Sequence, residues 1–378
     1  MSVPFTVPAF ADGAAAAVLE VLGSGWVTTG PQNAAFEKEF AAYLGAEHVL
    51  AVSSCTAALE LCMRALDLPP GTRVFTPSLT FCGAVAAIVH AGHEPVLVDV
   101  DEDTLVVTPE TIARAVRLHG SPGAVMVNHM AGYPVDPAAI AEAAGLPLNR
   151  VVEDVAHGPG GTVRGEQAGA RSFAACFSFY ATKNLAMGEG GAIATYDGDF
   201  ADRLRALRLH GMSKDAWRRY LPGGSWRYDV KEIGLKANLS DFQAALGRAA
   251  LKELPVWQER RAKLVARYDA ELGELVRLPA RPDPERHANH LYVIRVPGRD
   301  AVMAELAEAG VATSVHFIPV HHLTAYRDLP GARELPVTDR LGEELLSLPL
   351  YPSLSDEDQG QVVSALTSAL RRRSAQCV

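Results

Sequence analysis

The segment Glu153-Asp154-Val155-Ala156-His157 closes one apolar run of the chain, and Phe177-Ser178-Phe179-Tyr180-Ala181-Thr182-Lys183-Asn184 closes the next. Each segment places an ionisable side chain where a buried strand is expected to emerge into a loop. In an open α/β sheet, ligands bind at these carboxyl ends of the strands. We therefore predict that Asp154 and Lys183 belong to one site.

Outward from these segments, seven short apolar runs bounded by Gly, Pro or Asp are candidate strands. They are 49–52, 73–75, 95–100, 124–128, 150–154, 175–179 and 192–196. Helical patterns separate the early runs, at 57–66, 82–90, 109–117 and 137–143. This alternation predicts a mostly parallel sheet. Between Phe179 and Ala192 there is room only for a loop, so the last strand is expected to run antiparallel.

A second, smaller domain is expected in the last third of the chain. Ser240 is placed as the N-cap of a long helix that continues past Pro255 to Leu272. Beyond it the patterns indicate a strand, a helix, a second strand and a terminal helix, at 290–296, 301–309, 312–317 and 356–371. We predict a large α/β domain over residues 1–245 and a small α+β domain over residues 246–378.

The composition narrows the choice of partners. The net charge of −9 argues against binding to nucleic acid or to an anionic membrane, which both require a positive surface. The 5 cysteines are widely spaced and form no Cys-x-x-Cys pair, so we expect reduced thiols and no metal site. No apolar run approaches the roughly 20 residues that span a bilayer, and we predict a cytoplasmic protein.

The turn Ser53-Ser54-Cys55-Thr56 lies between a predicted strand and a predicted helix. It offers free backbone N–H groups, hydroxyls and the positive end of a helix dipole, which together suit a phosphate group. Simple N-capping explains the same residues. A dinucleotide site is less well supported, because no G-x-G-x-x-G follows a strand.

Lys183 and Asp154 have complementary chemistry. A lysine amine forms an imine with an aldehyde, and a carboxylate beside a ring nitrogen keeps that nitrogen protonated, as pyridoxal phosphate chemistry requires. Lys183 also precedes Gly188-Glu189-Gly190-Gly191, whose glycines let backbone approach a ligand, although a tight turn would explain them too. Taken singly, Asp154 and His157 could each be an ordinary loop residue.

In their order along the chain, these segments resemble the DegT/DnrJ/EryC1/StrS family of pyridoxal-phosphate sugar aminotransferases. The likeness is greatest to the branch that includes UDP-4-amino-4-deoxy-L-arabinose–oxoglutarate aminotransferase. It extends over nearly the whole chain, through the segments 24–31, 51–54, 76–81, 153–157, 177–191, 238–241, 315–317 and 347–350. It implies the aspartate-aminotransferase-like fold of type I, with a mostly parallel seven-stranded sheet.

The resemblance also implies roles for individual residues. Lys183 would hold the cofactor as an internal aldimine and move the proton, Asp154 would pair with the pyridinium nitrogen, and His157 would steady that carboxylate. Phe81 would stack on one face of the ring, with Val155 and Ala156 beneath the other. The phosphate would be bound by Ser54, the Cys55 amide, Thr56 and Ser178, and by Asn238 of a neighbouring subunit, which implies a homodimer with shared sites. Thr29, Arg227, Lys236, His316 and Phe317 are candidates for substrate binding.

Three positions depart from the family pattern. Cys55 replaces a small residue, which is harmless if only its amide is used. Phe317 replaces a tyrosine and so lacks a hydroxyl. Leu239 interrupts an Asn-x-Arg pattern, which puts the contact to the amino-donor carboxylate in doubt.

The segment 203–236 is rich in Lys and Arg, which suits a nucleotide diphosphate, although a solvated basic face is the simpler interpretation for any one of them. The family resemblance implies an aminotransferase that moves an amino group from L-glutamate, through pyridoxamine phosphate, to a keto carbon, C4 above all, of a nucleotide-linked deoxysugar. The alternatives are amination of a keto-cyclitol, formation of an aminohydroxybenzoate, or a regulator that keeps the fold and senses a ligand.

Overall fold

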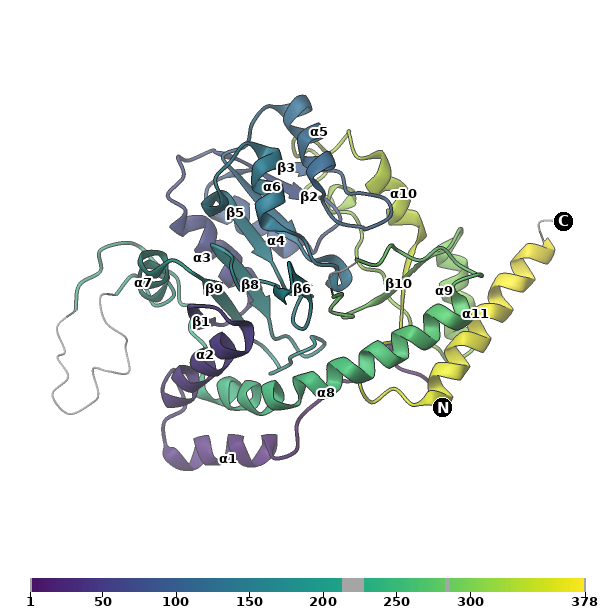
Figure 1. The fold of residues 1–378 in the computed structure, drawn as a ribbon, viewed down its shortest axis with the longest axis horizontal. Coiled ribbons are helices and arrows are strands. Elements are labelled where there is room, and N and C mark those ends of the chain that lie inside the picture. The colour runs from purple at the N-terminus through teal and green to yellow at the C-terminus, as the bar shows by residue number, and fades with distance from the viewer. Residues whose placement is uncertain (1, 213–227, 283–285, 377–378) are drawn as a thin grey trace.

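A computed structural model describes residues 2–212, 228–282 and 286–376 of the chain (Figure 1). Its centre is a seven-stranded sheet in the order β1-β9-β8-β5-β4-β2-β3. The strands are β1 (His48–Val52), β2 (Arg73–Pro77), β3 (Glu94–Val98), β4 (Ala124–Asn128), β5 (Val151–Asp154), β8 (Ala174–Ser178) and β9 (Gly191–Thr195). All seven candidate strands are confirmed.

The strand directions also agree with the sequence. Strands β3, β2, β4, β5 and β8 run parallel to one another. Strand β9 is antiparallel to both β8 and β1. A short loop cannot carry the chain back to the start of a parallel strand, which explains why the direction changes at β9.

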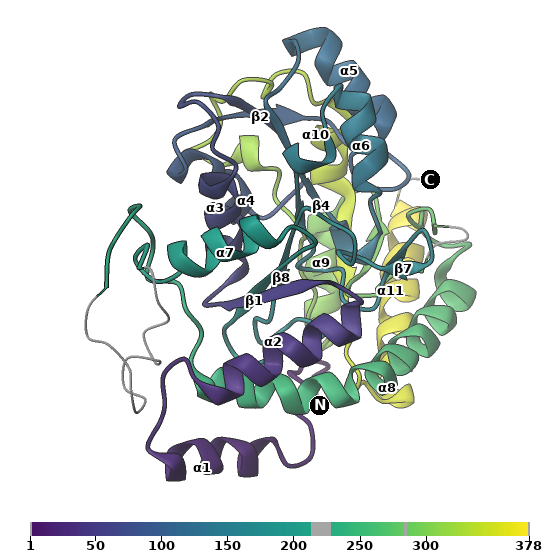
Figure 2. The same cartoon turned by 60° about the vertical axis from the view of Figure 1, so that its left-hand side comes forward.

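Helices cover both faces of the sheet (Figures 1 and 2). Successive side chains of a strand point to opposite faces. Thus Leu50 and Val52 of β1 join the core cluster of one face, and Val49 and Ala51 join that of the other. The first face is covered by α3 (Cys55–Ala65), α4 (Cys82–His90) and α7 (Gly198–Leu207), and the second by α2 (Pro31–Leu44), α5 (Pro109–His119), α6 (Pro137–Ala144) and the start of α8 (Asp241–Leu272).

Helix α8 links the sheet to a second core. Ser240 is its N-cap, as predicted, and forms a capping box with Gln243. The first half of α8 packs beside α1 (Ala14–Ser24) and α2, while Leu264 and Tyr268 in its second half enter a separate apolar cluster. That cluster also contains side chains of β10 (Tyr292–Arg295), β11 (Leu345–Leu348), α9 (Arg299–Glu308) and α11 (Asp356–Gln376). The domain boundary after residue 245 falls inside α8 and stays a prediction.

One predicted strand is wrong. Residues 312–317 form no strand and pair with β11 only at Ser314, opposite Ser347. His316 and Phe317, at the end of this segment, line a cavity instead of continuing the pairing with β11. The partner of β10 is β11 instead, which follows α10 (Pro336–Glu344).

The remaining elements are short: β6 (Thr162–Val163), β7 (Glu166–Gln167), and the 3-10 turns η1 (Met130–Gly132), η2 (Leu148–Arg150) and η4 (Val320–His322). Within the described ranges, no helix has the length and apolar character to cross a membrane.

Candidate active site

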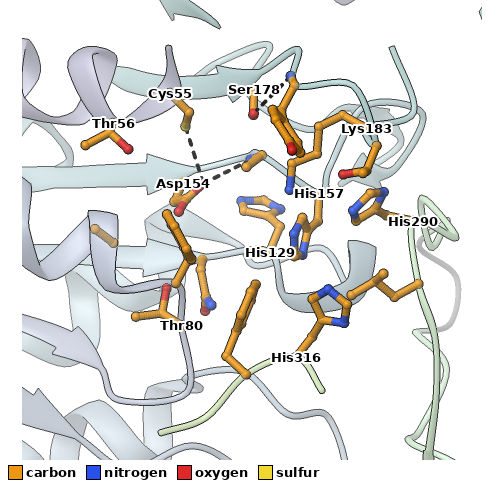
Figure 3. A pocket seen from close by; sticks show the side chains of 18 of the residues that line it. Cys55, Thr56, Thr80, His129, Asp154, His157, Ser178, Lys183, His290 and His316 are labelled. Carbon is orange, nitrogen blue, oxygen red and sulfur yellow. Dashed lines mark hydrogen bonds between the residues drawn. The ribbon is translucent and has the colours of Figure 1, made fainter. Parts of the chain in front are cut away.

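A cavity of about 480 Å³ opens at the carboxyl edge of the sheet (Figure 3). Asn128, Asp154 and Ser178 line it, and these are the last residues of β4, β5 and β8. Lys183 joins them from the loop after β8. Asp154 and Lys183 therefore lie in one cavity, as predicted.

Lys183 is partly buried, and its side chain points into the cavity (Figure 3). Burial disfavours the ammonium form and lowers the pKa of Lys183 to about 8. The nearby carboxylate of Asp154 opposes this shift by attracting the charged form. A substantial fraction of the amine is thus neutral near physiological pH, as a nucleophile that attacks an aldehyde must be.

Asp154 is held by two donors. Its Oδ1 atom accepts the Ala156 backbone N–H at 3.0 Å and lies 3.6 Å from the Cys55 thiol. Burial raises the pKa of this carboxyl, while the Ala156 N–H, Lys183 and the thiol all oppose that rise. Only the backbone amide of Cys55 was expected to have a role, but its side chain contacts the Asp154 carboxylate.

His157 does not steady Asp154 as expected. Its Nδ1 atom accepts the Ala131 backbone N–H at 3.2 Å, and the described residues show no hydrogen bond between His157 and Asp154. Burial lowers the pKa of His157 well below its usual value, so the ring is neutral and carries its proton on Nε2. His157 is consequently a hydrogen-bond donor at the cavity wall.

A second histidine, His290, was missed by the sequence analysis. Asn184 donates its amide hydrogens to the carbonyls of Pro159 and Ala288, so its Oδ1 can only accept from His290 Nδ1, at 3.1 Å. This leaves the Nε2 atom of His290 unprotonated, because burial also lowers the pKa of this ring. The two imidazole centroids lie 4.3 Å apart, which places a donor beside an acceptor.

Asn128 was missed as well, although it ends β4 as Asp154 ends β5. The two residues are register partners. Asn128 donates from Nδ2 to the Leu79 carbonyl at 3.0 Å, which fixes the amide. Its buried Oδ1 has no hydrogen-bond partner among the described residues. The same rule that selected Asp154, a polar residue at the end of an apolar run, would have found it.

The start of α3 forms one end of the cavity. Ser54 is the N-cap, and its Oγ accepts the Ala57 N–H at 3.1 Å, so the capping interpretation holds. Ser54, Cys55, Thr56 and Ser178 also line the cavity, and their hydroxyl and backbone N–H groups suit a phosphate group. This end is closed by a tight approach: a Cβ atom on Gly191 would lie 2.5 Å from the carbonyl carbon of Ser54.

Aromatic and apolar groups form the other walls. Phe81 is exposed to the extent of 56% and lies 6.0 Å from Phe317, centroid to centroid. Ala156 lines the cavity, whereas Val155 is fully buried in the core and does not. His316 lines the cavity beside Phe317, and burial lowers its pKa to about 4.

Three expected site residues lie elsewhere. Asn238, Thr29 and Lys236 do not line this cavity, although all three belong to the described residues. They form a cluster of their own: Asn238 Nδ2 donates to Thr29 Oγ1 at 2.6 Å, and Lys236 Nζ donates to Asn238 Oδ1. Arg227 lies outside the described residues.

Comparison with known proteins identifies the family. A model of the DegT/DnrJ/EryC1/StrS aminotransferase family matches residues 10–367. The chain belongs to this family. It is therefore a pyridoxal-phosphate-dependent sugar aminotransferase with the type I fold.

Individual members of the family align over almost the full chain. The spore coat polysaccharide biosynthesis protein SpsC of Bacillus subtilis is 41% identical over 97% of both chains. Spr1654 of Streptococcus pneumoniae, solved in its PMP form, superposes with a TM-score of 0.89 at 30% identity, over 98% of this chain and 99% of that one. The sugar aminotransferase CalS13 of Micromonospora echinospora gives 0.86 at 31%, over 97% and 99%.

The residues of the cavity fit the cofactor. The neutral fraction of the Lys183 amine suits an aldehyde, and the Asp154 carboxylate suits a pyridine nitrogen. The helix start and its hydroxyls suit a phosphate group. The unpaired Oδ1 of Asn128 is a buried acceptor that a polar ring substituent could satisfy.

Proposed function

We propose that this aminotransferase moves an amino group from L-glutamate to a keto carbon, C4 in particular, of a nucleotide-linked deoxysugar. The observation that carries the proposal is the shared cavity of Lys183 and Asp154, in which burial holds the pKa of the lysine at about 8. Pyridoxal phosphate, when bound, accepts and returns the amino group and delocalises the electrons of the broken C–H bond. The protein has to bind, orient and move protons.

Lys183 Nζ is the group that moves the proton in this proposal. A base works best when its pKa lies near the operating pH, and about 8 meets that condition. Asp154 Oδ1, fixed by the Ala156 N–H and the Cys55 thiol, would hold a proton on the ring nitrogen. His157 would donate from Nε2 to an oxygen of the cofactor or substrate.

The remaining cavity residues would orient the two ligands. Ser54, the Cys55 amide, Thr56 and Ser178 would hold the phosphate, and Phe81 and Ala156 would enclose the ring. His316 and Phe317 would face the substrate. They line the cavity and follow Ser314, which pairs with Ser347 of β11.

We also propose a homodimer with shared sites. Asn238 hydrogen-bonds to Thr29 outside the cavity of its own chain, so contact with a cofactor phosphate would be made in a second copy. Thr29 and Lys236 would accompany it there and face the substrate. In this arrangement both copies are needed for one complete site.

The nucleotide part of the proposal is supported less directly. Arg203 pairs with Glu232, Arg205 with Asp202, and Arg208 with Glu37, so these arginines are engaged within the chain. Their pairing gives no support to the expectation that this basic segment binds a nucleotide diphosphate. Lys214, Arg218, Arg219 and Arg227 lie outside the described residues.

The likeness to SpsC, whose name assigns it to polysaccharide biosynthesis, suggests that the aminated sugar enters a polysaccharide. We further propose a cytoplasmic location. The cysteines in the described part of the chain are all free thiols, as expected in a reducing compartment.

The decisive experiment charges the holoenzyme with the amino group of L-glutamate and removes the oxoacid. It then adds nucleotide-linked 3-keto and 4-keto sugars one at a time. We expect a 4-keto sugar to restore the absorbance of the Lys183-bound cofactor, and neither the charging nor the recovery to occur in Lys183→Ala. Lys252→Ala, which changes an exposed lysine of α8, is the matched control.

Another outcome favours an alternative. Recovery with a keto-cyclitol alone would replace the sugar-nucleotide assignment.

A further inference from the structure

A second cluster of ligating side chains lies outside the cavity. His321 and His322 end η4, and Asp339 lies in the first turn of α10. The Nε2 atoms of both histidines approach the same oxygen, Asp339 Oδ1, at 2.7 and 2.9 Å. The three ligand atoms all lie within 4.8 Å of one another.

Capping of α10 does not explain this arrangement. An acidic residue in the first turn often compensates the free N–H groups of a helix. Here Asp99 already accepts the backbone N–H groups of Val337 and Thr338, at 3.1 and 2.8 Å. Asp339 is therefore available for another role, and capping gives no reason for two imidazoles to converge on one of its oxygens.

The surroundings of the cluster resemble those of a metal centre. The Nδ1 atom of His321 lies 2.7 Å from Oγ of the fully buried Ser78. This hydrogen bond fixes the orientation of the His321 ring, with Nε2 directed toward Asp339. Such a second partner on the far ring nitrogen is typical of metal-binding histidines. His322 and Asp339 are exposed, which gives an ion a path from solvent and leaves room for water.

We propose that His321, His322 and Asp339 form a zinc site. Two imidazoles and one carboxylate, with water as the fourth ligand, are a donor set that Zn²⁺ accepts at about 2.0–2.2 Å per bond. An ion at the centre requires the ligand atoms to separate by a few tenths of an ångström, since neighbours around zinc lie about 3 Å or more apart. Rotation of the exposed His322 and Asp339 side chains can provide this.

The position of the site suggests what the ion does. It would join η4 to α10, whose ligands His322 and Asp339 are 17 residues apart in the chain, and one of its ligands, His321, contacts Ser78. Ser78 shortly precedes Thr80 and Phe81 in the cavity wall. Zinc would stabilise the segment that supports this wall, without touching the reacting groups.

The test measures zinc binding to metal-free holoenzyme by competition with a chromophoric chelator. We expect one zinc ion per chain, with at least 10-fold weaker binding in both His322→Ala and Asp339→Asn. His90→Ala is the control, because His90 is an exposed histidine whose only carboxylate neighbour shown is Glu60. Its affinity should equal that of the unaltered chain.

Zinc should also raise the melting temperature of the unaltered chain and of His90→Ala, but not that of His322→Ala. X-ray absorption of the loaded protein should show two imidazole ligands. Equal affinity in the unaltered chain and in His322→Ala would overturn the proposal, and so would a zinc spectrum without imidazole. These results are independent of the sugar substrate.

Discussion

The depressed pKa of Lys183 can be measured in the cofactor-free protein. With a pKa of about 8, roughly one-tenth of the Lys183 amine is neutral at pH 7. For an ordinary lysine, with a pKa of about 10.4, the neutral fraction is only about one in 2,500. At pH 7, Lys183 should therefore react with a small acylating reagent a few hundred-fold faster than it would with the pKa of an ordinary lysine.

Competitive labelling read by mass spectrometry gives this titration residue by residue. The midpoint for Lys183 is expected near pH 8, and exposed Lys252 on α8 reports reagent behaviour in the same sample. In Asp154→Asn the midpoint should move to lower pH, because the carboxylate that favours the ammonium form is gone. A Lys183 midpoint near 10.4, or a rise in Asp154→Asn, would refute the reasoning.

The same shift must appear in stability. The pKa of Lys183 is lower in the folded than in the unfolded chain, so between about pH 8 and 10.4 the unfolded chain binds more protons. The free energy of unfolding should rise with pH in this window, by up to about 3 kcal/mol relative to cofactor-free Lys183→Met. A constant difference between the two proteins over this window would contradict the assignment.

Three further substitutions, with Gly23→Ala as a control, probe the end of the cavity at the start of α3 and the proposed dimer. Gly191→Ala should lower the free energy of unfolding by about 2 kcal/mol or more, because its Cβ would lie 2.5 Å from the Ser54 backbone. Gly23→Ala in α1, where the added Cβ meets nothing within 4 Å, should raise the free energy of unfolding by about 0.5–1 kcal/mol. Equal melting temperatures of Gly191→Ala and Gly23→Ala would show that this steric contrast is wrong. Ser178→Ala should weaken cofactor binding by about 10-fold or more, as the loss of a hydrogen bond to a charged group predicts, and a fluorescence titration that finds less than a twofold change excludes this contact. Asn238→Ala should lose cofactor faster on dialysis although the residue lies outside its own chain's cavity, whereas unchanged retention in a dimer verified by light scattering would count against the shared site.

Much of the fold could be predicted from local sequence. Each strand of the large sheet is a short apolar run with clear boundaries. The segments that follow two of these strands contain the ionisable residues Asp154 and Lys183. The sequence pattern gave a wrong prediction where strand pairing joins residues that are distant along the chain. Residues 312–317 have the sequence pattern of a strand, but they form none, and His316 and Phe317 line the cavity. The strand that pairs with β10 is β11.

The sequence by itself determined the identity of the two central groups, Asp154 and Lys183, because strand ends in a parallel sheet converge on one edge. Only the tertiary structure decided what surrounds them. It replaced the expected His157 contact to Asp154 with the Cys55 thiol and the Ala156 N–H, and it added His290 from beyond the long helix. The Cys55 contact to Asp154 and the His290 contact to Asn184 join groups that are 99 and 106 residues apart in the chain, so no local pattern encodes them. The pKa of Lys183 follows from that burial and from the neighbouring charge, and is therefore also a property of the folded protein.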